Sequence, residues 1–208
     1  MMPWKVLNEI PIKYNTAYHF NGNERHAYRN RLTKTRSLSK GTRYQLEFKT
    51  NSQNGLMFYR ANSGKDAPLS RDYVALALSK GRLQLAYVCG GDLADDVRYL
   101  QSQVLVNDSK WHKVTIRQRK NSIQLKLNRE RDIKARCKRP QHGLKPNTKL
   151  WLGGAPKNSM LYSTLVTDEY LIGFKGCIRT FSVNNQILDL SRTAPGSSSR
   201  SLQLCQHG

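Results

Sequence analysis

Positively charged side chains are concentrated in two stretches of this sequence. The first stretch, residues 117–139, contains ten cations and only two acids, Glu130 and Asp132. Arginine makes forked contacts with sulfate and phosphate groups, whereas lysine acts as a point charge. The stretch therefore predicts a surface that binds a polyanion. Its cations are Arg117, Arg119, Lys120, Lys126, Arg129, Arg131, Lys134, Arg136, Lys138 and Arg139.

The second stretch, residues 25–43, contains seven cations and no acid at all. A single run of charge is usually a solvated face, but two runs of this density exceed what solubility needs. We interpret both as parts of a binding surface, with Arg25, Arg29, Arg31, Lys34 and Arg36 as ligand contacts from the second run. Lys40 and Arg43 complete that run.

The whole chain carries the same imbalance. Its 208 residues include 35 Lys and Arg against 14 Asp and Glu, which gives a formal net charge of +21. A charge this large attracts polyanions and works against compactness by self-repulsion. The partners it favours are nucleic acid, an anionic membrane surface or a sulfated glycan, and a basic surface kept for solubility is the alternative.

Nucleic-acid readers usually add exposed aromatic side chains or a helix for the major groove. The aromatic residues of this chain instead lie in strand patterns, which predicts that they belong to a core and that nucleic acid is not the partner. They are Tyr44, Phe48, Phe58, Tyr73, Tyr87, Trp151 and Phe181.

Catalytic chemistry has little support in the sequence, and we predict that the chain is not an enzyme. His112 has no visible nucleophile or orienting carboxylate beside it. The acids form no pair of the kind that glycoside hydrolysis needs, and Asp92, Asp95 and Asp96 lack the spacing of an EF-hand. The four cysteines form no CxxC motif, which disfavours a zinc site. They allow three disulfide pairings, and their even number favours an oxidising compartment.

Short strands with turns between them fill most of the chain. In residues 111–128, Val114 and Ile116 alternate with polar residues, and so do Ile123, Leu125 and Leu127 after a turn at 119–122. Period-two alternation predicts a hairpin with one face in a core, so its cations must point outward. Further strands are expected in residues 42–50, 55–62, 72–88, 148–154 and 174–190, with turns at 79–81 and 183–185. Residues 191–201 are rich in serine and are expected to form a loop.

Several of these segments, in this order, resemble the laminin G-like domain of laminin α chains, agrin, perlecan and neurexins. The segments are "GLMFYRAN", "DYVALALSKGRLQLAYVCGG", "SKWHKVTIRQRKNSIQLKLN", "LWLGGAP" and "FKGCIRTFSVNNQILDLS". The resemblance covers residues 18–205 and implies an all-β fold, a jelly-roll sandwich of two antiparallel sheets. We therefore expect a single domain at residues 18–208, preceded by a linker or edge segment at residues 1–17.

The resemblance also implies roles for individual residues. The late cysteines of the family pair, which matches Cys177–Cys205 and leaves Cys89 and Cys137 as the second pair. Trp111 and His112 match the family's "WH", with Trp111 expected as a hydrophobic plug and His112 as a support for the turn. Many family members bind calcium, for which the matching ligands are Asp72, the backbone carbonyl near Cys89, and Asn147. Only one of these is a carboxylate, which disfavours calcium here.

Several laminin G-like domains bind heparin or heparan sulfate through basic loops, so the resemblance and the two basic stretches lead to one hypothesis. We expect an extracellular adhesion module that binds heparin or heparan sulfate chains through basic strands and loops. A calcium-dependent contact with a cell-surface receptor of the dystroglycan or neurexin type is an alternative. An intracellular basic protein that binds nucleic acid is a second alternative. No membrane span is expected, because no apolar run approaches 18 residues, and no signal peptide is visible. An extracellular location therefore implies a fragment of a larger protein. Asn107 begins the sequence Asn-Asp-Ser, an acceptor pattern for N-glycosylation.

Overall fold

Two antiparallel β-sheets pack face to face in the computed structural model, which describes residues 16–28, 41–61, 73–88, 97–137, 148–157, 167–198 and 202–205. The first sheet (sheet A) has the strand order β10-β9-β8-β3-β12-β1-β14, and β13 pairs with β12 beside that path. Its strands are β1 (Tyr18–Asn21), β3 (Thr42–Lys49), β8 (His112–Arg119), β9 (Ser122–Leu127), β10 (Ile133–Arg136), β12 (Lys175–Val183), β13 (Gln186–Ile187) and β14 (Gln203–Leu204).

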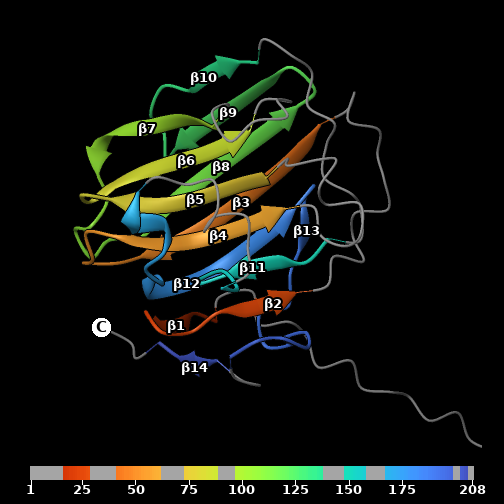
Figure 1. The fold of residues 1–208 in the computed structure, drawn as a ribbon. Helices are drawn as coiled ribbons and strands as arrows, with labels where there is room; N and C mark the ends of the chain where they lie inside the picture. The colour runs from red at the N-terminus through yellow and green to blue at the C-terminus, as the bar shows by residue number, and fades with distance from the viewer. Residues whose placement is uncertain are drawn as a thin grey trace, which may run out of the picture.

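The second sheet (sheet B) has the order β2-β11-β4-β5-β6-β7. Its strands are β2 (His26–Tyr28), β4 (Gly55–Ala61), β5 (Tyr73–Ser79), β6 (Arg82–Val88), β7 (Val97–Leu105) and β11 (Leu150–Leu152). A short 3-10 helix, Asp168–Tyr170, lies against β4 and β5. Sheet B lies in front of sheet A in Figure 1, so the predicted sandwich of two antiparallel sheets is confirmed.

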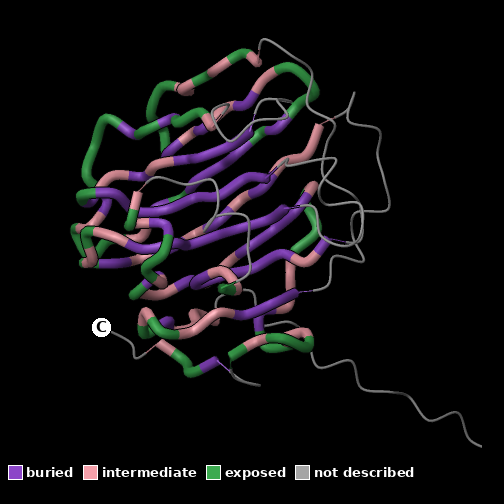
Figure 2. The backbone as a smooth tube through the Cα atoms, in the orientation of Figure 1, coloured by how far each residue is buried: buried purple, intermediate pink, exposed green. Residues whose placement is uncertain are grey.

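The core fills the space between the sheets, as the alternating pattern predicted. Tyr44, Leu46 and Phe48 of β3 point inward and are at most 2% exposed. The same holds for Ile123 and Leu125 of β9, which are fully buried. Figure 2 shows buried backbone along the middle strands of both sheets and exposed backbone at their margins. All seven aromatic residues that the sequence assigned to the core are buried. Five of them lie in the core between the sheets: Tyr44, Phe48, Phe58, Tyr87 and Phe181. Tyr73 and Trp151 belong instead to a second buried cluster, which also contains Tyr59 and Tyr170.

The strand bounds follow the expected segments closely, with the turns at Lys80–Gly81, Lys120–Asn121 and Asn184–Asn185. Lys80, Asn184 and Asn185 have positive φ angles, which tight hairpin turns require and which asparagine tolerates well. Residues 133–136, which lie outside the expected strands, form strand β10. The nine residues of β7 were not predicted as a strand.

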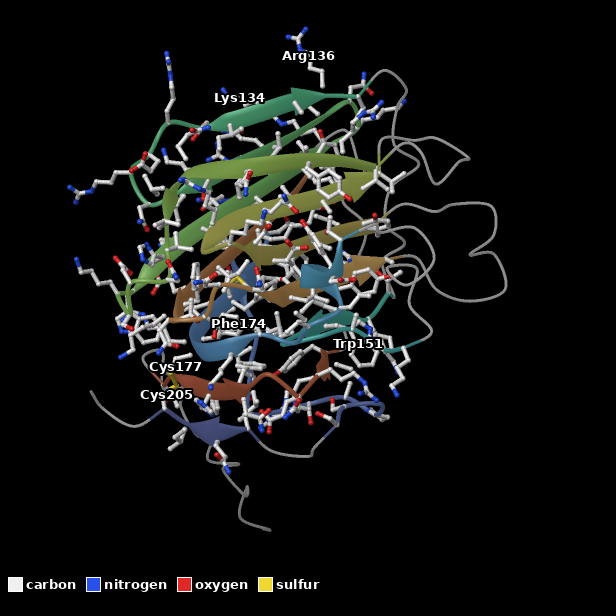
Figure 3. The ribbon with its side chains drawn as sticks, turned by 60° about the vertical axis from the view of Figure 1, so that its left-hand side comes forward. Lys134, Arg136, Trp151, Phe174, Cys177 and Cys205 are labelled. Carbon is white, nitrogen blue, oxygen red and sulfur yellow. A yellow bond between two sulfur atoms is a disulfide. The ribbon has the colours of Figure 1, made fainter. Side chains whose placement is uncertain are left out.

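One segment joins the two sheets through close backbone contact. Ile172 accepts a hydrogen bond from the backbone N–H of Leu56 (2.7 Å), and the N–H of Phe174 donates to the carbonyl of Gly153 (2.9 Å). Gly173 lies between them, against the backbone of Gly22 and Gly153. Phe174 then enters the core, where it is fully buried (Figure 3). The segment 171–174 therefore connects β4 and the end of β11, in sheet B, to the beginning of β12 in sheet A.

The C-terminal part of the chain covers one edge of the sandwich. The N–H of Ala194 donates to the carbonyl of Ala27 on β2, and the N–H of Ser198 donates to the carbonyl of Arg25. β14 then pairs with β1, and Cys205 forms a disulfide with Cys177 of β12. The predicted pair Cys177–Cys205 is therefore confirmed (Figure 3). Cys137 is also disulfide-bonded. Cys89 lies outside the described residues, so its pairing with Cys137 stays a prediction.

His26 on β2 makes stability depend on pH. Its side chain is fully buried, and neither ring nitrogen has a hydrogen-bond partner in the described part of the chain. Burial lowers the pKa of His26 below its usual value, against a smaller opposite effect of the Glu24 carboxylate. Below the usual pKa of histidine, the unfolded chain should therefore bind more protons at this side chain than the folded protein does.

We expect the free energy of unfolding to fall as the pH drops below about 6.5, with a limiting slope of about 1.4 kcal/mol per pH unit from this one group. Replacing His26 by Phe removes that contribution, because the side chain can no longer take up a proton. Urea titrations of both proteins between pH 5 and pH 8 measure it. Equal pH slopes for His26→Phe and wild type would contradict the assignment to His26.

Candidate anion-binding surface

The predicted hairpin forms, and its cations lie on the outer face of sheet A. The inward positions of β8 and β9 hold Val114, Ile116, Ile123 and Leu125, all buried. Because side chains alternate along a strand, the residues between them face outward. Arg117 and Arg119 are accordingly exposed. On β10, Ile133 and Ala135 pack against the core, which turns Lys134 and Arg136 outward.

The strand register brings five of these outward cations into two neighbouring rows. In the first row Arg43 of β3 is opposite Arg117 of β8, while Arg117 and Lys134 are both opposite Gln124 of β9. In the second row Arg119 and Arg136 are both opposite Ser122. We call the set of Arg43, Arg117, Arg119, Lys134 and Arg136 the cationic face.

The size of the cationic face follows from the spacing of the strands and of the residues along them. Strands lie about 4.8 Å apart, so the first row extends over about 14 Å from β3 to β10. The two rows lie two residues apart along the strands, which is about 7 Å. Figure 3 shows Lys134 and Arg136 projecting from β10 at the margin of the sandwich. Lys120, in the turn after β8, is exposed beside the second row.

Neutralising acids are few on this face. Among the described residues, no acid forms an ion pair with any of the five cations. Asp132 is the nearest acid in sequence to β10, but it contacts Lys126 (3.6 Å) and accepts a hydrogen bond from the side chain of Gln124. Like charges directly opposite each other, such as Arg43 and Arg117, destabilise a sheet. An anion bound between them removes that repulsion.

Arg129 and Arg131 lie elsewhere. They belong to the loop between β9 and β10, at the end of the hairpin opposite to Arg119 and Arg136. Lys126 lies on the outer face, but Asp132 partly neutralises it. Arg25 is next to β2, at the opposite edge of the sandwich from β10. The structure therefore does not bring these cations into the two rows. Arg29, Arg31, Lys34, Arg36, Lys138 and Arg139 lie outside the described residues.

Arg43 belongs to the cationic face, although the sequence analysis did not select it as a ligand contact. It is the last cation of the second basic run, and it lies directly opposite the first cation of the other run, Arg117. The alternation of Tyr44, Leu46 and Phe48 indicates that Arg43 points outward. It does not indicate that β8 is the strand beside β3, and that pairing is what places Arg43 opposite Arg117.

A shallow groove of about 220 Å³ adjoins the first row on the same outer face. Its lining comes from β3, β8, β12 and β13 and combines apolar surface, such as that of Ile187, with the polar side chains of Gln45, Glu47, Lys113, Thr180 and Ser182. Gln45 is two residues from Arg43 on β3, so the groove begins about 7 Å from the first row. Amide, hydroxyl and carboxylate groups of this kind can bind the hydroxyl groups of a sugar.

Glu47 has a structural role beside this groove. Its carboxylate contacts Arg179 (2.7 Å) and Lys113 (3.5 Å). The guanidinium group of Arg179 also lies 4.3 Å from the ring centre of Trp111, within the range of a cation–π contact. Trp111 is half-buried, so its prediction as a hydrophobic plug was wrong: the ring is covered by a cation on the surface.

His112 supports a turn, as the "WH" resemblance implied. Its Nε2 is 2.7 Å from Asp108 Oδ1, and its Nδ1 is 3.0 Å from the side-chain nitrogen of Asn128. The hydrogen bond with His112 holds the pKa of the Asp108 carboxyl below its usual value. The sequence analysis found no carboxylate beside His112, and Asp108 corrects that statement. Because both ring nitrogens are engaged, neither is available to act as a general base.

The calcium ligands proposed from the resemblance are Asp72, Cys89 and Asn147. All three lie outside the described residues, so calcium binding stays a prediction, as does a receptor contact at that rim. Asn107 is half-buried next to Gly81, and its glycosylation also stays a prediction. Among the described residues, no helix has the length and apolarity needed to cross a membrane.

The fold defines the chain as a jelly-roll β-sandwich, and comparison with known proteins identifies its family. Residues 48–189 match the family model described as the laminin G domain. The chain therefore belongs to the laminin G domain family, a family of non-catalytic binding modules. Domains LG4-5 of the mouse laminin α1 chain superimpose with a TM-score of 0.70 at 22% identity, over 91% of this chain and 46% of that chain.

Sequence relatives occur in large proteins. Pikachurin from Bos taurus is 28% identical over 145 residues, which is 70% of this chain and 13% of the relative. The basement membrane-specific heparan sulfate proteoglycan core protein from Mus musculus is 29% identical over 155 residues, or 74% of this chain and 4% of the relative. The chain thus spans only a small part of these relatives.

Proposed function

We propose that this domain is an extracellular matrix module that binds heparan sulfate or heparin-like chains on the cationic face. The observation that carries the proposal is the double row of Arg43, Arg117, Arg119, Lys134 and Arg136, with no acid paired to it in the described residues. Sulfate groups repeated along a chain match cations repeated across neighbouring strands. The name of the relative from Mus musculus, which refers to the basement membrane, supports an extracellular location.

The composition of the face favours sulfated glycan over nucleic acid. Four of its five cations are arginines, which bind sulfate through two hydrogen bonds at once. Base stacking needs exposed aromatic rings, and no aromatic side chain belongs to these two rows. The groove beside Arg43 supplies neutral polar groups for the sugar hydroxyls between sulfates. A glycan can bind along the two rows without a change in the fold, because the strands already hold the cations in place.

The test compares two variants that lose four positive charges each. The face variant changes Arg117, Arg119, Lys134 and Arg136 to Ala; Arg43 stays, because its Nε is buried. The control variant changes Lys110, Lys157, Lys175 and Arg192 to Ala; all four are exposed and lie outside the two rows. Each protein is eluted by a salt gradient from heparin-agarose and from a cation exchanger of equal charge density.

We expect heparin to retain the wild type well above about 0.2 M salt, where long-range attraction is already largely screened. The face variant should lose the retention on heparin that exceeds retention on the exchanger, whereas the control variant should keep it. The slope of log Kd against log salt should fall by about 3 to 4 in the face variant, about one for each lost contact. Equal losses in the two variants would mean that the charge acts diffusely, and the proposal would fail.

A further inference from the structure

The four edges of the two sheets are not protected equally. Natural proteins limit the pairing of open edges with short strands and with charged side chains. Three edges of this protein follow that rule. β2 has three residues and β14 has two, and β10 has four residues with two cations. β7 has nine residues and a single charge, Arg98, in a chain whose net charge is +21.

β7 also gathers exposed apolar side chains. Tyr99, Val104 and Leu105 are 38%, 36% and 55% exposed, and they make up three of the seven large hydrophobic side chains that are exposed in the described residues. Among the described strands, β7 pairs with β6 alone: the register is regular from Val97 to Gln101 and shifts before Leu105, so residues 102–104 form an irregularity beside the groove. The ring of Tyr99 packs against that of Tyr170 (6.3 Å between centroids), whereas Val104 and Leu105 lie at the end of β7 that has no second strand beside it among the described residues.

A groove of about 330 Å³ lies beside this edge, in the seam between the two sheets. Leu125, Leu127 and Ile133 of sheet A and Val104 of β7 line it. A water molecule occupies about 30 Å³, so the groove has room for a leucine or phenylalanine side chain. Ser102 stabilises the backbone here, because its Oγ accepts from the N–H of Leu83 (3.0 Å) and donates to the carbonyl of Val104 (2.9 Å). The guanidinium group of Arg82 donates to the carbonyl of Gln103.

We propose that β7 is a docking edge for an extended, acidic segment of a partner protein, which adds as a strand and places an apolar side chain in the groove. Backbone hydrogen bonds to an edge strand supply affinity in this mode, and pockets for alternate side chains supply specificity. The groove opening carries Arg131, Lys134, Glu130 and Asp132, and Asp132 is already engaged by Lys126. The remaining charge at the opening is positive, as is the whole chain, so acidic residues beside the apolar one complement it.

The charge argument also selects against a second copy of this chain as the occupant. Two molecules of net charge +21 repel each other, and pairing of β7 with β7 would leave both grooves without a side chain from an acidic segment. A partner that carries negative charge is attracted by the same positive charge. The partner is therefore a foreign strand in which glutamate or aspartate alternates with leucine, isoleucine or phenylalanine.

The probe for the test is a fluorescein-labelled peptide of nine residues that alternates leucine and glutamate. Its control is the same peptide with N-methyl groups on every second backbone nitrogen, which keeps the charge and removes the hydrogen-bond donors of one edge. The protein variant is Val104→Glu, which places at the groove a negative charge that repels the glutamates of the peptide. Ile187→Glu is its matched control, since Ile187 is 39% exposed and lies on β13 of the other sheet. Anisotropy is measured at about 0.15 M salt.

We expect saturable binding of the peptide to the wild type, with a Kd on the order of 10–100 µM. Val104→Glu should weaken it at least tenfold, Ile187→Glu less than twofold, and backbone methylation at least tenfold. Binding that is indifferent to methylation would be mere charge attraction and would overturn the proposal. Equal effects of the two glutamate variants would overturn it too. So would concentration-dependent dimerisation that Val104→Glu abolishes. Protection from exchange, in the free monomer, of those β7 amide protons that do not bond to β6 would also overturn it, because the edge would then already be covered.

Discussion

Replacing Gly173 by Ala is expected to lower the free energy of unfolding by about 3 kcal/mol or more. A methyl group built on Gly173 would overlap the carbonyl oxygen of Gly22. It would also lie 2.8 Å from the carbonyl carbon of Gly22 and 2.9 Å from the carbonyl oxygen of Gly153. All three are backbone atoms, so the clash cannot be relieved by turning a side chain. The sheets must separate locally, or the segment 171–174 must leave its place.

Gly154 provides the matched control. A methyl group there would come no closer than 3.3 Å to Arg25 Cβ and the carbonyl oxygen of Glu24, so we expect Gly154→Ala to cost about 1 kcal/mol or less. Chemical denaturation followed by tryptophan fluorescence measures both variants. If Gly173→Ala unfolds at the same denaturant concentration as Gly154→Ala, the close backbone junction of residues 22, 153 and 173 is not present in solution.

Removal of the Cys177–Cys205 disulfide should cost about 3–4 kcal/mol in the chain-entropy model, because the bond closes a loop of 28 residues. The bond holds β14 against β1 at the sheet edge, where only two register pairs join these strands. Without the bond, the unfolded chain gains freedom while the native state retains only weak pairing. The C-terminal cover of β2 should then open more often than the rest of the sandwich.

The double variant Cys177→Ser with Cys205→Ser tests this without leaving a free thiol. Reduction of the wild type is less informative, because Cys137 is disulfide-bonded as well. Urea titration gives the change in stability, and hydrogen exchange locates the opening. We expect the amide of Cys205, which donates to the carbonyl of Ala17 (2.9 Å), to lose protection first. An unchanged urea midpoint would contradict the loop-closure argument.

Strands with one buried face could be predicted from the sequence, and edge strands could not. β3, β8 and β9 alternate cleanly because every second side chain enters the core. β7 lacks that signal: its burial pattern has only two buried positions in nine, since the strand borders solvent along one margin. β14 has two residues, and its pairing depends on β1, which is 182 or more residues earlier in the chain. No local pattern can encode such a partner.

The arrangement of the cations could not be predicted from the sequence. Charge density indicates a polyanion as the ligand, which stays a prediction, whereas the alternation correctly placed the hairpin cations outward. Which cations share a surface depends on the register between β3, β8, β9 and β10, and that register joins Arg43 to the hairpin while separating Arg129 from Arg119. Likewise, Asp108 meets His112 because a turn at residues 108–110 folds back on the strand.

The facing pair of Arg43 and Arg117 links the stability of the fold to the ions around it. In the unfolded chain these residues are far apart, so their repulsion is a cost of the folded state alone. Any anion that enters between them binds the native state preferentially and shifts the folding equilibrium toward it by mass action. If the cationic face binds polyanions as proposed, the free energy of unfolding should be lowest at low salt and should rise when a polyanion is added. The stability of this domain would thus depend on which anions surround it.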